Sequence, residues 1–383
     1  MKHHQYNPDF KFVEDPISFN KYTDKDMLRY CLGATMYMPG SKDFAGKILT
    51  NAMPGLTSMV LDFEDACRAE DLTEAENNAL SLLEEIGAAV ENGSLSDDHL
   101  PLIFCRVRSP KQFESFASKI QAKHLRALCG INFPKFNGDN GDEYYSILRD
   151  LNDRLGEIVY GMPIIEDSRV AYAESRIDQL LAIRAILDKY KDLVLHVRVG
   201  ATDFSSCFGM RRGIDYTIYD IMTVRQILSD ILNIFGRGND YVVSGPVWEY
   251  FRADKSMKFQ ELAHHDVQES ILKRKPVYNN EVDGLLREML LDRANGFVGK
   301  TVIHPTHVKF VNAMSAVTDE EYRDAMQILE TSGGVTKSPS GNKMNEIGPH
   351  RAWASRIAMR AKAYGVIKDG TEYFKLFSGE PNA

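Results

Sequence analysis

The feature that most constrains the fold is an alternation of short apolar runs with longer amphipathic segments. Each run ends at glycine, proline or a polar residue, which is typical of buried strands. The predicted strands are Tyr30–Met38, Ser58–Phe63, Leu102–Val107, Ala127–Phe133, Glu157–Ile165, Val194–Val199, Tyr241–Ser244 and Phe297–Ile303. Strands that alternate with helices in this way predict an α/β protein, a parallel (β/α)8 TIM barrel of the usual ~250 residues.

The main alternative is an open, doubly wound sheet. Such a sheet often carries a GxGxxG segment after its first strand or a Walker sequence, and this chain has neither. Polar residues also follow strands throughout the chain, as a closed ring of strands would arrange them. These observations favour the barrel.

The chain divides into three predicted parts. Residues 1–26 form a leader packed outside the barrel, residues 27–315 form the barrel, and residues 316–383 form a C-terminal helical extension. A Gly/Ser-rich stretch at 331–343 is the best candidate for a boundary loop. The basic helix expected at 349–364 either docks on the barrel or covers an active site, its own or a neighbour's.

Two of the predicted barrel helices carry apolar residues at helical spacing. One stripe comprises Ile221, Val224, Leu228, Ile231 and Phe235. In the helix that follows residue 167, the inward residues are predicted to be Ile177, Leu180, Leu181 and Leu187.

Composition narrows the functional classes. The net charge of −8 argues against a nucleic-acid-binding protein, which usually carries a basic patch. No apolar run approaches the ~18 residues of a membrane helix, and the N-terminus lacks the apolar core of a signal peptide. The five cysteines form no CxxC pair and predict reduced thiols in a cytoplasmic protein.

Charged residues follow the predicted strands and should meet at one face of a barrel. They are Asp62, Glu64, Asp65, Arg106, Arg108, Lys135, Glu166, Asp167, Asp203 and His304. Several carboxylates around one pocket repel one another unless a cation neutralises them. Oxygen ligands without a Cys or His cluster point to Mg²⁺, or Mn²⁺, and the favoured pair is Glu166 and Asp203.

Each of these residues also has a structural alternative. Asp62 or Asp65 could cap the turn that follows the strand. Lys135 could be a structural ion-pair partner, and His304 could satisfy a backbone group instead of moving protons. An arginine beside a metal suits recognition of a carboxylate or stabilisation of an enolate oxygen.

At these residues the sequence resembles the HpcH/HpaI aldolase and citrate lyase β-subunit family. The segments that carry the resemblance are MYMPG (36–40), VLDFEDA (60–66), CRVRSP (105–110), FPK (133–135), PIIED (163–167), GATDFSSCFG (200–209) and GFVGKTVIHP (296–305). They occur in the family's order over residues 30–315, each at a predicted strand end. The longer chain looks like a divergent branch of TIM-barrel C–C bond lyases.

The resemblance implies that Glu166 and Asp203 bind Mg²⁺ and that Arg106 contacts the substrate carboxylate or enolate. Three positions depart from the family pattern: Arg108 replaces an asparagine, Asp167 replaces a common threonine, and Asn137 replaces an acidic residue. These departures change the expectation for the substrate. We assign substrate binding to Arg106, Arg108, Lys135, Gly200 and His304, and general acid/base catalysis to Glu64 or Asp65.

The predicted function is Mg²⁺-dependent carbon–carbon cleavage, or its reverse, on a small hydroxy or oxo acid or its coenzyme A thioester. One alternative is a thioesterase or a biosynthetic enzyme for a phosphorylated or sugar-derived substrate. Another is a non-catalytic ligand-binding or assembly subunit. No nucleic-acid or membrane partner is expected, and the resemblance suggests a homo-oligomer, a trimer or larger.

Overall fold

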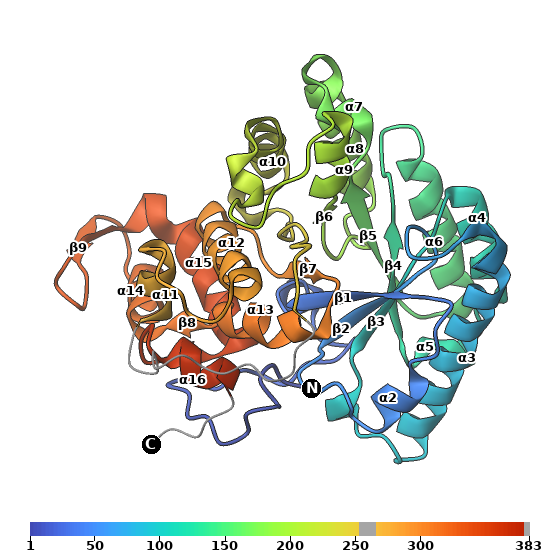
Figure 1. The fold of residues 1–383 in the computed structure, drawn as a ribbon, viewed down its shortest axis with the longest axis horizontal. Coiled ribbons are helices and arrows are strands. Elements are labelled where there is room, and N and C mark those ends of the chain that lie inside the picture. Colours follow the sequence, from blue (N-terminus) through green and yellow to red (C-terminus); the bar gives the residue numbers. More distant parts are fainter. Residues whose placement is uncertain (253–265, 379–383) are drawn as a thin grey trace.

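The computed structural model describes residues 1–252 and 266–378. Within these residues, the central element is a parallel sheet of seven regular strands in the order β6-β5-β4-β3-β2-β1-β7 (Figure 1). The strands are β1 (Ala34–Pro39), β2 (Ser58–Asp62), β3 (Leu102–Arg106), β4 (Leu128–Phe133), β5 (Tyr160–Ile165), β6 (Arg198–Val199) and β7 (Lys300–Val302). Sequential strands are neighbours from β1 to β6, as the rules for parallel α/β sheets require.

The segment at residues 241–245 closes this sheet into a barrel. Val243 forms a parallel bridge with Val197, just before β6, and Gly245 forms one with Lys300 of β7. The amide of Ser244 donates to the carbonyl of Val197 at 2.9 Å, and the amide of Val298 donates to the carbonyl of Val243 at 2.9 Å. The predicted strand Tyr241–Ser244 therefore supplies the eighth position of the barrel, although its pairing is too short to make a regular strand.

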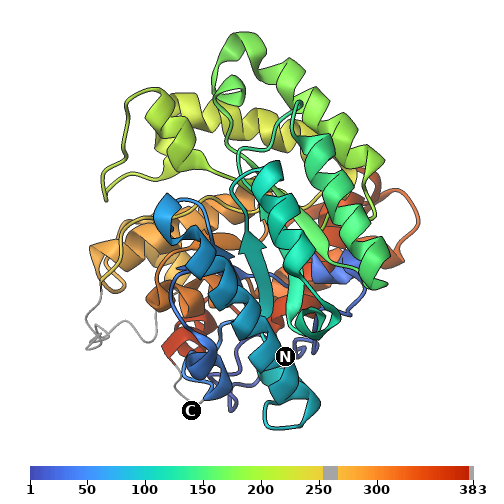
Figure 2. The ribbon, with the colours of Figure 1, turned by 90° about the vertical axis from the view of Figure 1, so that its right-hand side faces the viewer.

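The strands are buried on both faces. Every residue of β2, β3, β4 and β5 is buried, which explains why these segments show continuous apolar runs and no alternation. Helices α3, α4 and α6 lie side by side over the outer face of the sheet (Figure 2). Because the strands are parallel, their carboxyl ends all lie at one face of the barrel.

The helices that follow the strands make the outer layer. The α-helices are α1 (Lys25–Leu28), α2 (Ala45–Leu49), α3 (Leu72–Glu91), α4 (Pro110–Lys119), α5 (Ala122–Leu125), α6 (Gly141–Leu155), α7 (Ser168–Ala171), α8 (Ala173–Lys189), α9 (Ala201–Cys207), α10 (Met222–Phe235), α11 (Val267–Leu272), α12 (Asn280–Asn295), α13 (Val308–Met314), α14 (Asp319–Glu330), α15 (Ile347–Tyr364) and α16 (Glu372–Ser378). In the part of the chain that the structure describes, none of them has the length and apolar character needed to cross a bilayer.

The apolar stripes are confirmed in α10 and only partly in α8. In α10 all but one of the predicted positions are buried; Ile221 caps the helix and is partly buried. In α8, Leu180 and Leu187 are buried, but Ile177 and Leu181 are 47% and 49% exposed. The inward face of α8 instead includes Arg176, whose guanidinium donates to the carbonyls of Val170 and Ala171 and pairs with Asp230.

The leader contacts both the barrel and the C-terminal extension. His3 Nε2 lies 3.0 Å from the carbonyl of Cys31, and His4 Nε2 lies 3.0 Å from the carbonyl of Tyr364. Glu14 bridges β11 (Val366–Ile367), which pairs with β8 (Val317–Thr318). His3 and His4 are buried, so the start of the leader packs between these two parts of the protein.

The C-terminal extension has a small apolar cluster of its own, comprising Val317, Ala325, Ile328, Ile347, Ala354, Ile357, Ala361 and Val366. Within it, the stretch predicted as a boundary loop forms a hairpin of β9 (Val335–Lys337) and β10 (Met344–Glu346). That hairpin lies inside the extension, and the division at residue 315 stays a prediction.

Helix α15 docks on the barrel at the amino ends of the strands. Arg356 donates to the carbonyl of Gly296 at 3.2 Å and to Asn239 Oδ1 at 2.8 Å. Both partners directly precede strand segments, so they mark the face opposite the strand-end carboxylates. The idea that this basic helix covers the chain's own active site is therefore wrong.

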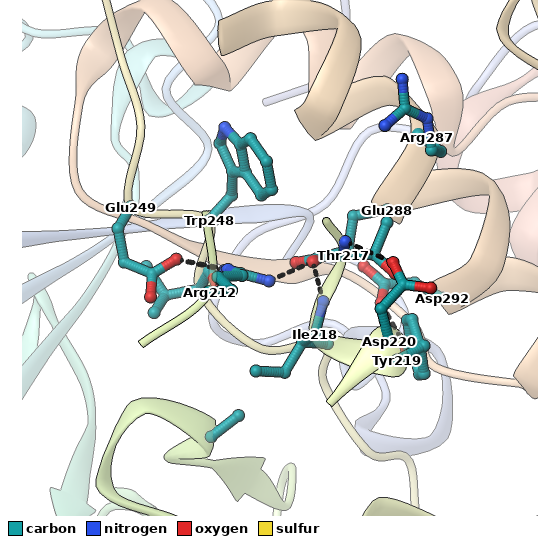
Figure 3. A network of polar contacts seen from close by, with 12 residues as sticks. Arg212, Thr217, Ile218, Tyr219, Asp220, Trp248, Glu249, Arg287, Glu288 and Asp292 are labelled. Atoms are coloured by element: carbon teal, nitrogen blue, oxygen red, sulfur yellow. Dashed lines mark hydrogen bonds and ion pairs between the residues drawn. The ribbon is translucent and has the colours of Figure 1, made fainter. Parts of the chain in front are cut away.

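A buried ionic network holds the loops after β6 and after residue 245 against α12 (Figure 3). Glu288, fully buried, accepts from Arg212 and from the amide of Ile218. Arg212 also donates to Glu249 and to the carbonyl of Val247. One helical turn after Glu288 in α12, Asp292 accepts a hydrogen bond from the hydroxyl of Tyr219 at 2.5 Å. This network fixes two loops at the carboxyl face of the barrel.

Candidate active site

A cavity of about 410 Å³ opens among the carboxyl ends of the strands. Its lining residues are Tyr37, Pro39, Asp62, Asp65, Ala66, Arg106, Ile164, Glu166, Arg198, Val199, Gly200, Thr202, Asp203, Val247, Thr301 and Ile303. This is the face of a TIM barrel that carries chemistry, and the volume suits a small molecule. Five of the ten charged residues predicted at strand ends therefore line one cavity: Asp62, Asp65, Arg106, Glu166 and Asp203.

Arg106, at the end of β3, is held by carboxylates from the neighbouring strand. Its Nε and Nη2 each donate to Asp62 at 2.6 Å, in the bidentate geometry that arginine and carboxylate favour. Its Nη1 faces Glu64 Oε2 at 2.8 Å and Asp65 Oδ2 at 3.0 Å. Burial opposes the charge of Arg106, but the hydrogen bonds and charge of Asp62 outweigh it and raise the pKa of the guanidinium.

Asp62 also organises the loop that carries these carboxylates. Its Oδ1 accepts the amide of Glu64 and its Oδ2 accepts the amide of Ala66, both at 3.0 Å. It is 1% exposed, so its charge is compensated almost entirely by these donors and by Arg106. Asp62 both caps the turn and orients Arg106, which combines the two interpretations that the sequence allowed.

Glu166 and Asp203 converge on Gly200. The position that a Gly200 Cβ would occupy lies 2.3 Å from Glu166 Oε2 and 3.0 Å from Asp203 Oδ2. Burial and the charge of Asp203 raise the pKa of Glu166 to about 8. Burial and the charge of Asp65 likewise raise the pKa of Asp203. Both carboxylates are thus disfavoured in their charged forms, and a cation bound beside them would stabilise those forms.

Lys135 positions Glu166 through its backbone. Its φ of 47° lies in the left-handed region, which is unfavourable for a residue with a side chain. In this conformation its amide donates to Glu166 Oε1 at 2.9 Å, and its Nζ binds Glu64. Backbone strain of this kind is concentrated at functional sites. Glu166 is therefore held through one oxygen, while the other faces Gly200 and Asp203.

The donor set fits Mg²⁺. Glu166 and Asp203 offer hard oxygen ligands, and the absent side chain of Gly200 leaves space beside both oxygens. Across residues 1–252 and 266–378, no group of three or more His, Cys, Asp or Glu side chains is arranged to hold a metal. The protein would thus supply two carboxylates and leave the other positions to water and substrate, as Mg²⁺ sites commonly do.

Three residues predicted to bind substrate lie outside the cavity lining: Lys135, whose Nζ binds Glu64, together with Arg108 and His304. Arg108 donates to the carbonyl of Cys67 at 3.2 Å, so its guanidinium serves the loop after β2. His304 accepts from the amide of Thr306 and stacks on Phe251 with ring centroids 4.2 Å apart. All three positions follow strand ends, but none of the three side chains lines the cavity.

Three polar lining residues could not be predicted from strand ends, because they lie within strands and not after them. They are Tyr37 of β1, Arg198 of β6 and Thr301 of β7. The hydroxyl of Tyr37 accepts from Asn132 at 2.7 Å, and its ring lies against Arg106 and Arg198. The available signal was a charged or polar residue inside an otherwise apolar run, as in HVRVG at 196–200.

A family described as C–C bond lyases of the TIM-barrel fold matches residues 26–366. The chain belongs to this family. The match confirms the predicted fold class and family resemblance, and it extends beyond residue 315 into the C-terminal extension. No curated protein sequence matches this C–C bond lyase family member.

Solved structures support the same fold. Protein CitE from Mycobacterium tuberculosis, in complex with magnesium, acetoacetate and coenzyme A, is 16% identical with a TM-score of 0.50. The similarity covers 87% of this chain and 99% of that chain. Haloferax volcanii malate synthase, in a magnesium and glyoxylate complex, is 14% identical with a TM-score of 0.50 and 72% coverage of each chain.

The proximity of Gly200 to both carboxylates makes Gly200→Ala a direct test of the pair in this lyase-family barrel. The new Cβ would meet Glu166 Oε2 at 2.3 Å and Glu166 Cβ at 2.6 Å, so Glu166 must move. We expect Mg²⁺ affinity, measured by isothermal titration calorimetry, to fall by about 10–100-fold. The matched control is Gly46→Ala in α2, where an added Cβ meets nothing within 4 Å. Equal affinity in Gly200→Ala and wild type would contradict the pair.

The raised pKa of Glu166 makes Mg²⁺ binding pH-dependent. Below about pH 8 the metal-free protein holds a proton on Glu166, and Mg²⁺ must displace it. We therefore expect Mg²⁺ affinity to increase by up to about tenfold per pH unit between pH 6 and pH 8. In the metal-free protein, the stability gained from the protonated carboxyl is complete below the unfolded-state pKa and is lost as pH rises through about 8. Stabilisation by Mg²⁺ in thermal unfolding should accordingly be larger at pH 8.5 than at pH 6, and Glu166→Gln should weaken this dependence to the part that the raised pKa of Asp203 contributes.

Proposed function

We propose that this protein is a Mg²⁺-dependent carbon–carbon lyase that cleaves, or forms in reverse, a bond next to a carbonyl or carboxyl group. The observation that carries the proposal is the convergence of Glu166 and Asp203 on Gly200, in a cavity that Arg106 also lines. Membership of the C–C bond lyase family supports it. The magnesium bound to CitE and to malate synthase supports the choice of metal.

Glu166 and Asp203, whose carboxylates converge on Gly200, would hold the metal. Mg²⁺ bound there would supply a Lewis acid for a substrate oxygen. Arg106 would place its positive charge beside the same substrate oxygen or beside a substrate carboxylate. Its Nη1 is available for this contact because it pairs only with Glu64 and the exposed Asp65. Asp62 keeps the guanidinium in place while Nη1 exchanges partners.

Asp65 is the better candidate for general acid/base catalysis. Its side chain is 63% exposed and lines the cavity, and its contact with Arg106 is its one ion pair among the described residues. Glu64 is bound by both Arg106 and Lys135 and is not among the lining residues. Asp65 can therefore move a proton to or from substrate without breaking a buried ion pair.

The substrate that we propose is a small hydroxy or oxo acid, free or as its coenzyme A thioester. A cavity of about 410 Å³ accepts the acid portion, and its open mouth leaves a thioester tail outside. CitE was solved with acetoacetate and coenzyme A, which supports both forms. Arg108 and His304, which do not line the cavity, have no role in this proposal.

Exchange of substrate hydrogen for deuterium tests the reaction class before the full substrate is known. An enzyme that stabilises an enolate should exchange the C3 hydrogens of a 2-oxo acid such as pyruvate in D₂O, which proton NMR measures. We expect exchange that requires Mg²⁺ and stops with EDTA. A panel of 3-hydroxy acids and their coenzyme A thioesters then tests cleavage. A protein that binds Mg²⁺ but catalyses neither exchange nor cleavage would be a binding subunit, contrary to the proposal.

A further inference from the structure

Arg198 is a buried cation with no anionic partner among residues 1–252 and 266–378. It is 1% exposed, yet it lines the cavity. Its guanidinium donates from Nη1 to Thr35 Oγ1 at 3.2 Å and from Nη2 to Thr301 Oγ1 at 2.6 Å. Its Nε has no partner in the part of the chain that the structure describes. All of its side-chain partners are thus neutral.

The two arginines of the cavity have opposite surroundings. The ring of Tyr37 lies close to both, with its centroid 5.2 Å from the guanidinium carbon of Arg106 and 5.8 Å from that of Arg198. Arg106 is surrounded by three carboxylates, whereas burial lowers the pKa of Arg198 and only Tyr37 opposes that shift. His196, two residues earlier, is buried with its pKa lowered, so its imidazole is neutral. A buried charge without a counterion is costly, and proteins rarely keep one.

We propose that Arg198 binds a second, distal carboxylate of the substrate, so that this lyase acts on a dicarboxylate. The inference rests on the proposed function, which places one end of the substrate at Glu166 and Asp203. The distal carboxylate would supply the counterion that the protein lacks. The hydroxyl of Thr301, which accepts from Arg198, keeps its own proton free to donate to that carboxylate.

The strand geometry separates the two ends of the site. Arg198 lies on β6 and reaches Thr301 on β7 and Thr35 on β1, so its side chain crosses the barrel interior beside the closing segment at 241–245. Glu166 and Asp203 lie after the ends of β5 and β6. A substrate with one acidic group at each end would span the cavity. One unpaired guanidinium matches the single charge of a carboxylate better than the double charge of a phosphate.

Matched ligands test the proposal by isothermal titration calorimetry in the presence of Mg²⁺. 2-Oxoglutarate and 2-oxoadipate carry the distal carboxylate, while 2-oxopentanoate and 2-oxohexanoate carry a methyl group in its place. We expect the wild-type protein to prefer at least one dicarboxylate by about tenfold or more over its matched monocarboxylate. Absence of any preference at both lengths would overturn the proposal. Tighter, Arg198-dependent binding of 2-oxo-4-phosphonobutyrate than of 2-oxoglutarate would overturn the choice of carboxylate.

Substitution of Arg198 provides a second test of the proposal. Arg198→Met should abolish the preference, leave Mg²⁺ affinity unchanged and raise the melting temperature of the ligand-free protein by about 2–4 °C, because it removes an uncompensated buried charge. Arg198→Lys should retain part of the preference. Arg323→Met, at a side chain 64% exposed on α14, is the control and should behave as wild type. If Arg198→Met keeps the wild-type preference, Arg198 is not the anion site.

The two proposals fail in different ways. Loss of the dicarboxylate preference in Arg198→Met is measured by binding and needs no turnover. If Mg²⁺-dependent exchange is absent while this preference is present, the lyase proposal fails and the anion site stands. If exchange is present and no dicarboxylate preference exists, the lyase proposal stands and the anion-site proposal fails.

Discussion

Replacing Lys300 with methionine is expected to lower the free energy of unfolding by about 3–5 kcal/mol. Lys300 is fully buried in β7 and donates at 2.8 Å to both Glu288 and Asp292 of α12. Without its ammonium group, two carboxylates would share one buried space. Burial is the main cause that raises the pKa of Asp292 to about 6, and the charge of Lys300 acts in the opposite direction. The pKa of Asp292 should therefore rise further when Lys300 is replaced.

Urea unfolding followed by circular dichroism measures this loss. Lys189→Met is the matched control, because Lys189 pairs with Asp142 on the surface with side chains 57% and 54% exposed. Exposed pairs of this kind contribute about 0–1 kcal/mol. A loss in Lys300→Met no larger than in the control would show that the network is not a source of stability. The variant should also be less destabilised at pH 5 than at pH 8, since protonation of the carboxylates relieves their repulsion.

The barrel was predictable because its strands are short, buried on both faces and separated by helices. Such strands are continuous apolar runs, and the eight predicted runs coincide with the seven regular strands and the closing segment. Boundaries were less predictable. Val194–Val199 was predicted as one strand, yet β6 is only Arg198–Val199, because regular pairing with β5 spans only these two residues, while Val194 and Val197 form isolated bridges.

Helix α8 shows where counting apolar residues gave a wrong result. Ile177 and Leu181 are apolar but lie on the outer flank, while Arg176 occupies an inward position. The guanidinium of Arg176 is buried because two backbone carbonyls and Asp230 satisfy it. Such compensation comes from the fold and has no signature in the local sequence.

The candidate site was likewise only partly predictable from the sequence. Arg106, Glu166 and Asp203 were predictable because the carboxyl ends of parallel strands meet at one face. The position of a residue after a strand does not determine whether its side chain lines the cavity. Arg108 and His304 follow strand ends but contact Cys67 and Phe251 instead. Arg198 and Thr301 were missed because only barrel closure shows which side of a buried strand faces the cavity. The closing segment at 241–245, the shortest predicted strand, is what brings β6 and β7 near each other.

Asp203→Asn is expected to abolish measurable Mg²⁺-dependent exchange, a loss of at least about 100-fold. A Lewis acid contributes several kcal/mol to stabilisation of negative charge, and about 1.4 kcal/mol is tenfold in rate. Asparagine keeps the shape of Asp203 but removes the charge that, with Glu166, would hold the cation. Mg²⁺ affinity, measured by calorimetry at pH 8, should fall in the same variant.

This variant separates loss of metal from loss of structure. The pKa of Asp203 is raised by burial and by Asp65, so the ionised form is disfavoured in the metal-free protein. A neutral asparagine should therefore leave the metal-free melting temperature unchanged or raise it, while the increase that Mg²⁺ gives in wild type disappears. Asp150→Asn, at an exposed position of α6, is the matched control and should keep both the metal response and the exchange. Wild-type Mg²⁺ affinity in Asp203→Asn would refute the metal assignment. Lost exchange with retained affinity would instead make Asp203 a group that acts on the substrate, beside a metal held elsewhere.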